Sequence, residues 1–155
     1  MRNIQQEYDM LKILIAVDGS EHSNRAIEAV EKMARSSPGL EAILVCVRTG
    51  AILEPLFSGD YTVATVQKLD ADQENQQATV LNSAMDHAKA QGLKISESVR
   101  TYGVIANEIV RIAKERQVDQ IAMGTRGMGA VGSLLLGSVA QRVLHQSDVP
   151  VLLVK

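Results

Sequence analysis

The chain has little of what marks nucleic-acid binders, disulfide-bonded proteins and membrane proteins. Its 155 residues carry a formal net charge of −2 and no basic block, so an electrostatic footprint for nucleic acid is missing. The single cysteine, Cys46, has no partner for a disulfide or a thiolate metal cluster. No apolar run approaches the roughly 18 residues of a membrane span, and the first residues lack a signal-peptide core. We therefore expect a cytoplasmic protein that binds no nucleic acid and inserts into no membrane.

What is present fits one ordinary globular domain. Hydrophobic residues make up 46% of the chain and charged residues 22%, in a length that matches a single domain. We find no internal repeat, linker or low-complexity tract. The sequence predicts one domain over residues 1–155, with residues 1–10 as a loose polar lead-in.

Short apolar segments alternate with segments of helical periodicity. Ser20 is placed to cap the first helix, and Gly92 to end a helix that begins near Lys68. Within that helix, residues 70–77 are polar all round and are expected to face solvent, while residues 49–66 before it are expected to form a loop. The predicted strands span residues 11–17, 42–47, 94–101, 119–123 and 150–154. This alternation predicts an α/β fold, a three-layer doubly wound five-stranded parallel sheet, with strand 94–101 at an edge.

The most informative stretch joins the fourth strand to the last helix. Five of the eleven glycines lie within residues 123–138, a density that allows backbone N–H groups to approach a ligand closely. The helix that follows has Leu136, Val139, Ala140, Val143 and Leu144 on one apolar face. A glycine-rich entry to a helix N-terminus is suited to binding phosphate. In doubly wound sheets ligands bind outside the carboxyl ends of the strands, so we expect Asp18 to face this loop across one crevice.

Two familiar phosphate motifs fit poorly. Residues 127–132 match G-x-G-x-x-G, but they follow the fourth strand, and no acidic residue stands where a ribose contact would need it. The Walker pattern is absent because Gly137-Ser138 lacks the lysine.

A third spacing fits better: glycine, two residues, glycine, nine residues, glycine, serine, at Gly124, Gly127, Gly137 and Ser138. With Ile13–Ser20 and the segment Val149–Leu152, this spacing resembles the ATP-binding branch of the universal stress protein family. The resemblance implies the strand order 3-2-1-4-5 of an adenine nucleotide alpha hydrolase-like fold. It also implies a homodimer through the C-terminal strand, residues 150–154.

The resemblance further implies a set of ATP-binding residues. Asp18 would contact the ribose or base, the backbone of Val47 the adenine edge, and Gly137 and Ser138 the phosphates. Mg²⁺ would be carried on the phosphates and not by protein side chains. The full predicted set is Ala16, Val17, Asp18, Val47, Met123, Gly124, Arg126, Gly127, Gly137, Ser138 and Val139.

Arg126 is the only cation of the glycine-rich loop, so AMP or a cyclic nucleotide stays open as the ligand in place of ATP. The three histidines lie on separate predicted helices, and no pair of residues has the spacing of a nucleophile and its base. The resemblance therefore implies an ATP-binding regulatory protein of the stress response that acts on a downstream protein partner. A slow ATPase or phosphotransferase is the alternative.

Overall fold

A computed structural model describes residues 10–49, 59, 62–128 and 136–155. The predicted lead-in, except Met10, lies outside the described residues, as do most of the predicted 49–66 loop and the glycines Gly129 and Gly132. The described elements alternate between strand and helix as the apolar patterns predict. In chain order they are β1 (Lys12–Ala16), α1 (Glu21–Ser36), β2 (Glu41–Arg48), α3 (Val63–Gln91), β3 (Ile95–Tyr102), α4 (Ile105–Glu115), β4 (Gln120–Gly124), α5 (Ser138–Gln146) and β5 (Val151–Val154).

The five strands form one parallel sheet in the order β3-β2-β1-β4-β5. The predicted strand order is therefore confirmed, including the edge position of the alternating strand β3. β1 pairs with β2 on one side and with β4 on the other, so the strand order reverses at β1. Strands β2 and β3 are added on one side of it, and β4 and β5 on the other. The ends of β1 and β4 thus lie beside each other, which is where open α/β sheets bind their ligands.

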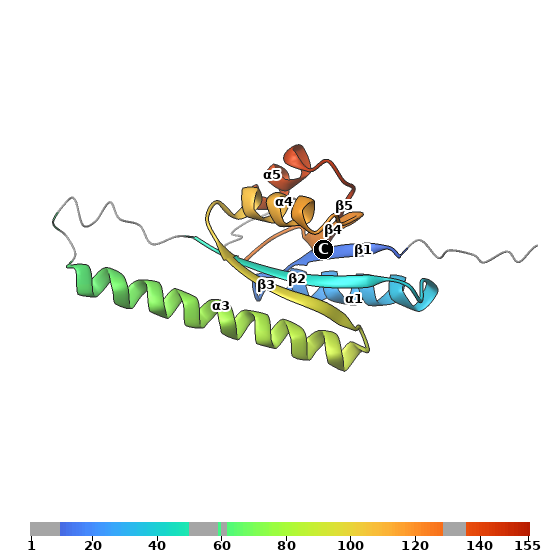
Figure 1. Ribbon diagram of the computed structural model, residues 1–155, viewed down its shortest axis with the longest axis horizontal. Helices are drawn as coiled ribbons and strands as arrows, with labels where there is room; N and C mark the ends of the chain where they lie inside the picture. The colour runs from blue at the N-terminus through green and yellow to red at the C-terminus, as the bar shows by residue number, and fades with distance from the viewer. Residues whose placement is uncertain (1–9, 50–58, 60–61, 129–135) are drawn as a thin grey trace, which may run out of the picture.

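Helices cover both faces of the sheet. Figure 1 shows α1 and α3 below it and α4 and α5 above it. The lower layer packs Ile13, Ile15 and Leu44 against α1 and α3, and the upper layer packs Leu14 and Ile121 against α4 and α5. These strand residues are fully buried, because a strand covered on both faces must be apolar on both.

Local signals set most of the helix ends. The Ser20 side chain caps α1 by accepting a hydrogen bond from Ser23 N at 3.1 Å. Gly92 ends α3 in the left-handed conformation, with φ of 86°, which glycine adopts without steric cost. On α5, Ala140 and Val143 are buried as predicted. Leu144 is 48% exposed, so its predicted place on the inner face is wrong; it lies about 100° around the helix from Val143, at the margin of a narrow stripe.

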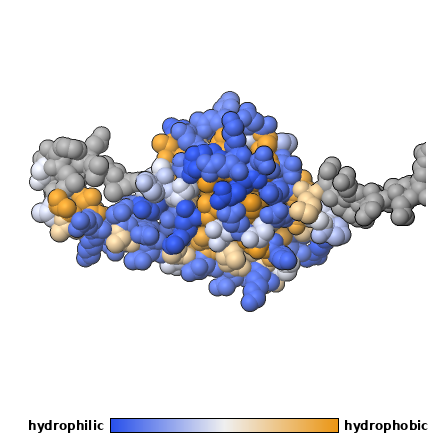
Figure 2. All heavy atoms as spheres, viewed as in Figure 1, coloured by the Kyte–Doolittle hydropathy of each residue, from blue (hydrophilic) through white to orange (hydrophobic). Residues whose placement is uncertain are grey.

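The helix α3 differs most from expectation. It begins at Val63, where Thr62 caps it, and not near Lys68, so residues 63–66 belong to a helix and not to a loop. Its 29 residues extend to about 43 Å at 1.5 Å per residue. Its N-terminal half projects beyond the carboxyl ends of β2 and β3 (Figure 1), and the surface along α3 in this view is largely hydrophilic (Figure 2). Within the described parts of the chain, no helix combines the length and apolar character needed to cross a bilayer.

Candidate functional site

Asp18 connects the ends of β1 and β4. One carboxylate oxygen accepts a hydrogen bond from Ser20 N at 3.0 Å, which stabilises the turn from β1 into α1. The other accepts from Met128 N at 3.1 Å, in the loop that follows β4. Asp18 therefore faces the glycine-rich loop across the crevice, as the sequence predicts, and part of its hydrogen-bonding capacity is used to hold that loop.

The glycines of this loop stand where side chains would collide. A Cβ atom on Gly124 would lie 2.6 Å from Cβ of His22, and one on Gly127 would lie 2.6 Å from a carboxylate oxygen of Asp18. The Gly137 N–H donates to the carbonyl of Thr125 at 2.7 Å, which joins the described start of the loop to its end. The glycines thus allow β4, α1 and α5 to approach one another closely.

The N-terminus of α5 directs backbone N–H donors toward this space. Gly137 is its N-cap and has no side chain to accept a hydrogen bond from the first turn. The helical hydrogen bonds begin with Gln141 N, which donates to the Gly137 carbonyl at 3.0 Å. The N–H groups of the residues before Gln141 have no intrahelical partner, and such groups carry a partial positive charge that favours an anion.

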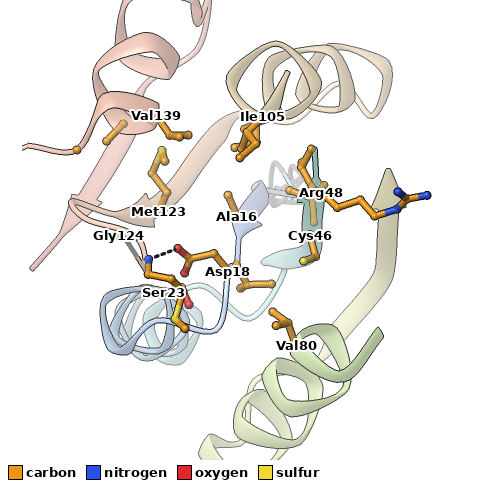
Figure 3. A pocket seen from close by; sticks show the side chains of 18 of the residues that line it. Ala16, Asp18, Ser23, Cys46, Arg48, Val80, Ile105, Met123, Gly124 and Val139 are labelled. Atoms are coloured by element: carbon orange, nitrogen blue, oxygen red, sulfur yellow. Dashed lines mark hydrogen bonds between the residues drawn. The ribbon is translucent and has the colours of Figure 1, made fainter. Parts of the chain in front are cut away.

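A cavity of about 660 Å³ opens at the carboxyl ends of the strands, within the size range of small-molecule sites. Asp18 and Ala16 lie between Val80 of α3 on one side and Ile105 of α4 on the other (Figure 3). The structure brings together around it every predicted site residue: Ala16, Val17, Asp18, Val47, Met123, Gly124, Arg126, Gly127, Gly137, Ser138 and Val139. Their contacts with a nucleotide stay a prediction.

Two features of the lining were missed by sequence reasoning. Ile105 and Ile109 of α4 add apolar surface, and Gln73 and Gln77 of α3 add amide groups. Gln77 is only 6% exposed, so the expectation that residues 70–77 all face solvent is wrong. The signal that could have found the glutamines is the spacing of Gln73, Gln77 and Val80, which continues the buried face of α3 toward its N-terminus.

The backbone of β2 is open beside this cavity. Val17 N donates to the Val45 carbonyl at 2.9 Å, and the pairing of β1 with β2 ends with Ala16 opposite Val45. Because backbone groups alternate in direction along a strand, the N–H and C=O of Val47 point to the same side as those of Val45. They face the space that β1 no longer fills, next to Asp18.

Two side chains that line the cavity are less available to a ligand than their residue types suggest. Burial, and secondly the charge of Asp18, raise the pKa of the Cys46 thiol to about 11, so Cys46 stays protonated near neutral pH. Arg48 is directed away from the cavity (Figure 3). Its guanidinium pairs with Asp70 at 2.5 Å and lies 5.3 Å from the centre of the Tyr102 ring.

Comparisons with known proteins identify the family. The model of the universal stress protein family matches residues 10–155, and the chain therefore belongs to that family. A universal stress protein of Thermus aquaticus is 34% identical, with 92% of this chain and 97% of that protein covered.

Solved structures agree with this assignment. The structure of MJ0577, a universal stress protein of Methanocaldococcus jannaschii, is similar with a TM-score of 0.73 and 26% identity, over 94% of this chain and 96% of that one. A universal stress protein solved in complex with cAMP has a TM-score of 0.63 and 25% identity, again over 94% and 96%. The predicted adenine nucleotide alpha hydrolase-like fold is confirmed.

Proposed function

We propose that this protein binds an adenine nucleotide, with ATP as its ligand, in the cavity between Asp18 and the N-terminus of α5, and that it acts as a regulatory protein of the stress response. The observation that carries the proposal is the convergence of a carboxylate, helix-end N–H groups and an open strand edge on one 660 Å³ cavity. These groups match the ribose, the phosphates and the base of a nucleotide. The cAMP complex of a similar protein supports the same ligand class.

The phosphates would bind at the start of α5. The N–H groups there, beginning with Ser138, have no helical partner and lie at the positive end of the helix dipole. Arg126 also lines the cavity and would add one positive charge. The described residues hold no group of three potential metal-binding side chains. Mg²⁺ would therefore be coordinated mainly by the phosphates and by water, which suits an ion that keeps much of its hydration shell.

The base and the ribose would bind nearer to β1 and β2. The N–H and C=O groups of Val47 face the cavity and can pair with the edge of adenine. The neighbouring surfaces of Ile105, Met123 and Val139 are apolar and would pack against the ring. Asp18 accepts two backbone hydrogen bonds, but a carboxylate has about four acceptor positions, which leaves capacity for a ribose hydroxyl.

The residues that line the cavity suit nucleotide binding and do not suggest fast catalysis. Among the described residues around the cavity, Asp18 is the one carboxylate, and there is no histidine. Cys46 is held as a thiol, and Asp18 is engaged by two backbone N–H groups. Among the described lining residues, Asp18 is therefore the one candidate general base, and two backbone N–H groups already fix its orientation. We infer that nucleotide occupancy acts by altering the loop between Gly127 and Gly137, which a downstream protein then recognises.

Calorimetric titration with Mg-ATP, AMP and cAMP tests the proposal. The variant Gly137→Val should abolish binding of all three, because its Cβ would lie 3.3 Å from the Thr125 carbonyl and its methyl groups would fill the entry to α5. Gln141→Val is the matched control, since it places the same side chain on the exposed face of α5. If the parent protein binds none of the nucleotides, or Gly137→Val binds them as the parent does, the proposed site is wrong. ADP produced in excess over protein would favour the slow ATPase.

We also propose that β5 pairs with the β5 strand of a second copy. Ile121 N donates to the Pro150 carbonyl and Thr125 N to the Val154 carbonyl, so these residues face β4. By alternation, Leu153 directs its N–H outward from the edge of the sheet, and an open edge of this kind favours pairing. Light scattering should find a dimer for the parent and for Leu153→Ala, and a monomer for Leu153→Pro, which lacks that N–H. A monomeric parent protein would contradict the proposal.

A further inference from the structure

The helix α3 presents a polar face to the cavity that the family spacing does not involve. Gln73, Gln77 and Val80 are separated by four and three residues, so they lie on one side of the helix. All three line the cavity, and Val80 points toward Cys46 at the end of β2 (Figure 3). The face therefore lies over the strand end at which the base of a nucleotide would bind.

Gln77 is fixed in one orientation. Its side-chain nitrogen lies 2.7 Å from the carbonyl oxygen of Cys46 and 2.7 Å from that of Thr101. Because both neighbours are acceptors, only the NH₂ end of the amide can face them. The oxygen of Gln77 is thereby turned away from these two carbonyls, and it cannot exchange places with the nitrogen without losing both hydrogen bonds.

Gln73 lies one turn closer to the N-terminus of α3, and its amide oxygen is buried without a hydrogen-bond partner. The segment that carries it is anchored to β2, since Asp70 pairs with Arg48 at 2.5 Å. A buried acceptor without a donor is unfavourable, and a ligand that supplies an N–H group would relieve this cost. The Gln73 oxygen is therefore a suitable acceptor for an N–H group of a ligand. It lies one turn from the Gln77 amide, whose orientation is fixed.

We propose that Gln73 and Gln77, the amide pair, select a base that carries an amine at C6, which is adenine over hypoxanthine or guanine. This inference rests on the proposed nucleotide site. The amine at C6 of adenine can donate to the Gln73 oxygen while the Gln73 NH₂ donates to an adjacent ring nitrogen. Gln77 can contribute only its oxygen, as a second acceptor, because both its N–H groups are engaged. Hypoxanthine and guanine have an oxygen at C6, so two acceptors would face each other. Specificity built on such hydrogen bonds is strong because a mismatch leaves buried polar groups unpaired.

Titration of the purified protein with Mg-ATP and Mg-ITP tests the amide pair, because the two ligands differ at C6 of the base and carry the same phosphates and ribose. The parent protein should bind ATP at least about tenfold more tightly than ITP, the discrimination of one good amide pair. Gln73→Leu should reduce this ratio to about twofold or less, mainly through weaker ATP binding. Gln67→Leu, an exposed glutamine on the same helix outside the cavity lining, should keep the parent ratio.

The ratio separates selection from general damage, because a distorted or less stable site would weaken both nucleotides together. Gln77→Leu provides a second measurement, with the same fall in the ratio expected and its folding checked by thermal unfolding. If the parent binds ATP and ITP equally, or Gln73→Leu retains the parent ratio, the amide pair does not select the base, while the proposed nucleotide site stands. If the parent binds neither nucleotide, both proposals fail.

Discussion

Two walls enclose the cavity, and they differ in how the sequence encodes them. The glycine wall consists of Asp18, Gly124, Gly127, Gly137 and Ser138, and its residues have a fixed spacing that can be recognised in the sequence. The glutamine wall consists of Gln73, Gln77 and Val80 of α3, and it looks like an ordinary solvated helix face. The difference teaches that steric requirements leave a pattern in the sequence, whereas a polar side chain buried by distant elements leaves little.

The glycine wall should be the less tolerant of added atoms. Gly124→Ala places a Cβ 2.6 Å from Cβ of His22 and 2.9 Å from its backbone carbonyl carbon. Since α1 and β4 must move apart, we expect the free energy of unfolding in urea to fall by about 3 kcal/mol. Gly127→Ala is the control: its new Cβ meets a carboxylate oxygen of Asp18, a side-chain atom that can rotate away. Equal losses for the two variants would mean that backbone contact is not what distinguishes them.

Cys46 lines the cavity next to Val80 of the glutamine wall (Figure 3). The reactivity of its thiol therefore reports on how well this part of the cavity is shielded. Its pKa of about 11 leaves roughly a hundredfold less thiolate at pH 8 than an exposed cysteine has. Alkylation by iodoacetamide should therefore be slower by about two orders of magnitude in the folded protein than in urea. The chain has one cysteine, so mass spectrometry measures this reaction without ambiguity.

The same pKa predicts how stability changes in alkali. The folded state holds the thiol proton more tightly than the unfolded state, so the unfolded state binds fewer protons as pH rises from about 9 to 11. The contribution of Cys46 to stability is therefore present below this range and is lost through it. Cys46→Ala should lessen the decline between these pH values, and an unchanged pH profile would contradict the assigned burial.

The glutamine wall should contribute to stability in spite of its polar composition. Gln77→Leu removes two hydrogen bonds of 2.7 Å to the carbonyls of Cys46 and Thr101. At about 1 kcal/mol for each, the free energy of unfolding should fall by about 2 kcal/mol. Gln76→Leu is the matched control, because Gln76 is exposed on the adjacent position of the helix. Its effect should be within about 0.5 kcal/mol. Equal effects of the two variants would show that Gln77 behaves as a solvated residue.

The smallest effect is expected at the outer end of the glutamine wall. Arg48→Met removes the pairing with Asp70 and the contact with Tyr102, which we expect to cost about 0.5–1 kcal/mol. Part of this cost should disappear in 1 M salt, where charges are screened. Arg100→Met is the control, since Arg100 is exposed and forms no ion pair with the described residues. A salt-independent loss would indicate that packing of the arginine stem matters more than its charge.

Much of the fold could be predicted because its strands are buried on both faces. β1 and β4 appear as continuous apolar runs, and β3 shows its edge position through alternation. The helix limits were predicted where a local signal exists, as at Ser20 and Gly92. The start of α3 was misplaced because its first turns project beyond the sheet, where no apolar periodicity is required.

The sequence by itself determined the alternation of strands and helices, the buried faces and the spacing of Gly124, Gly127 and Gly137, where neighbouring groups approach closely. These follow from steric limits and from side-chain periodicity, which act over a few residues. Only the tertiary structure decided that α3 brings Gln73 and Gln77 to the end of β2, and that the backbone of Val47 opens toward Asp18. Such contacts join residues far apart in the chain, and their hydrogen bonds depend on a geometry that no local pattern specifies.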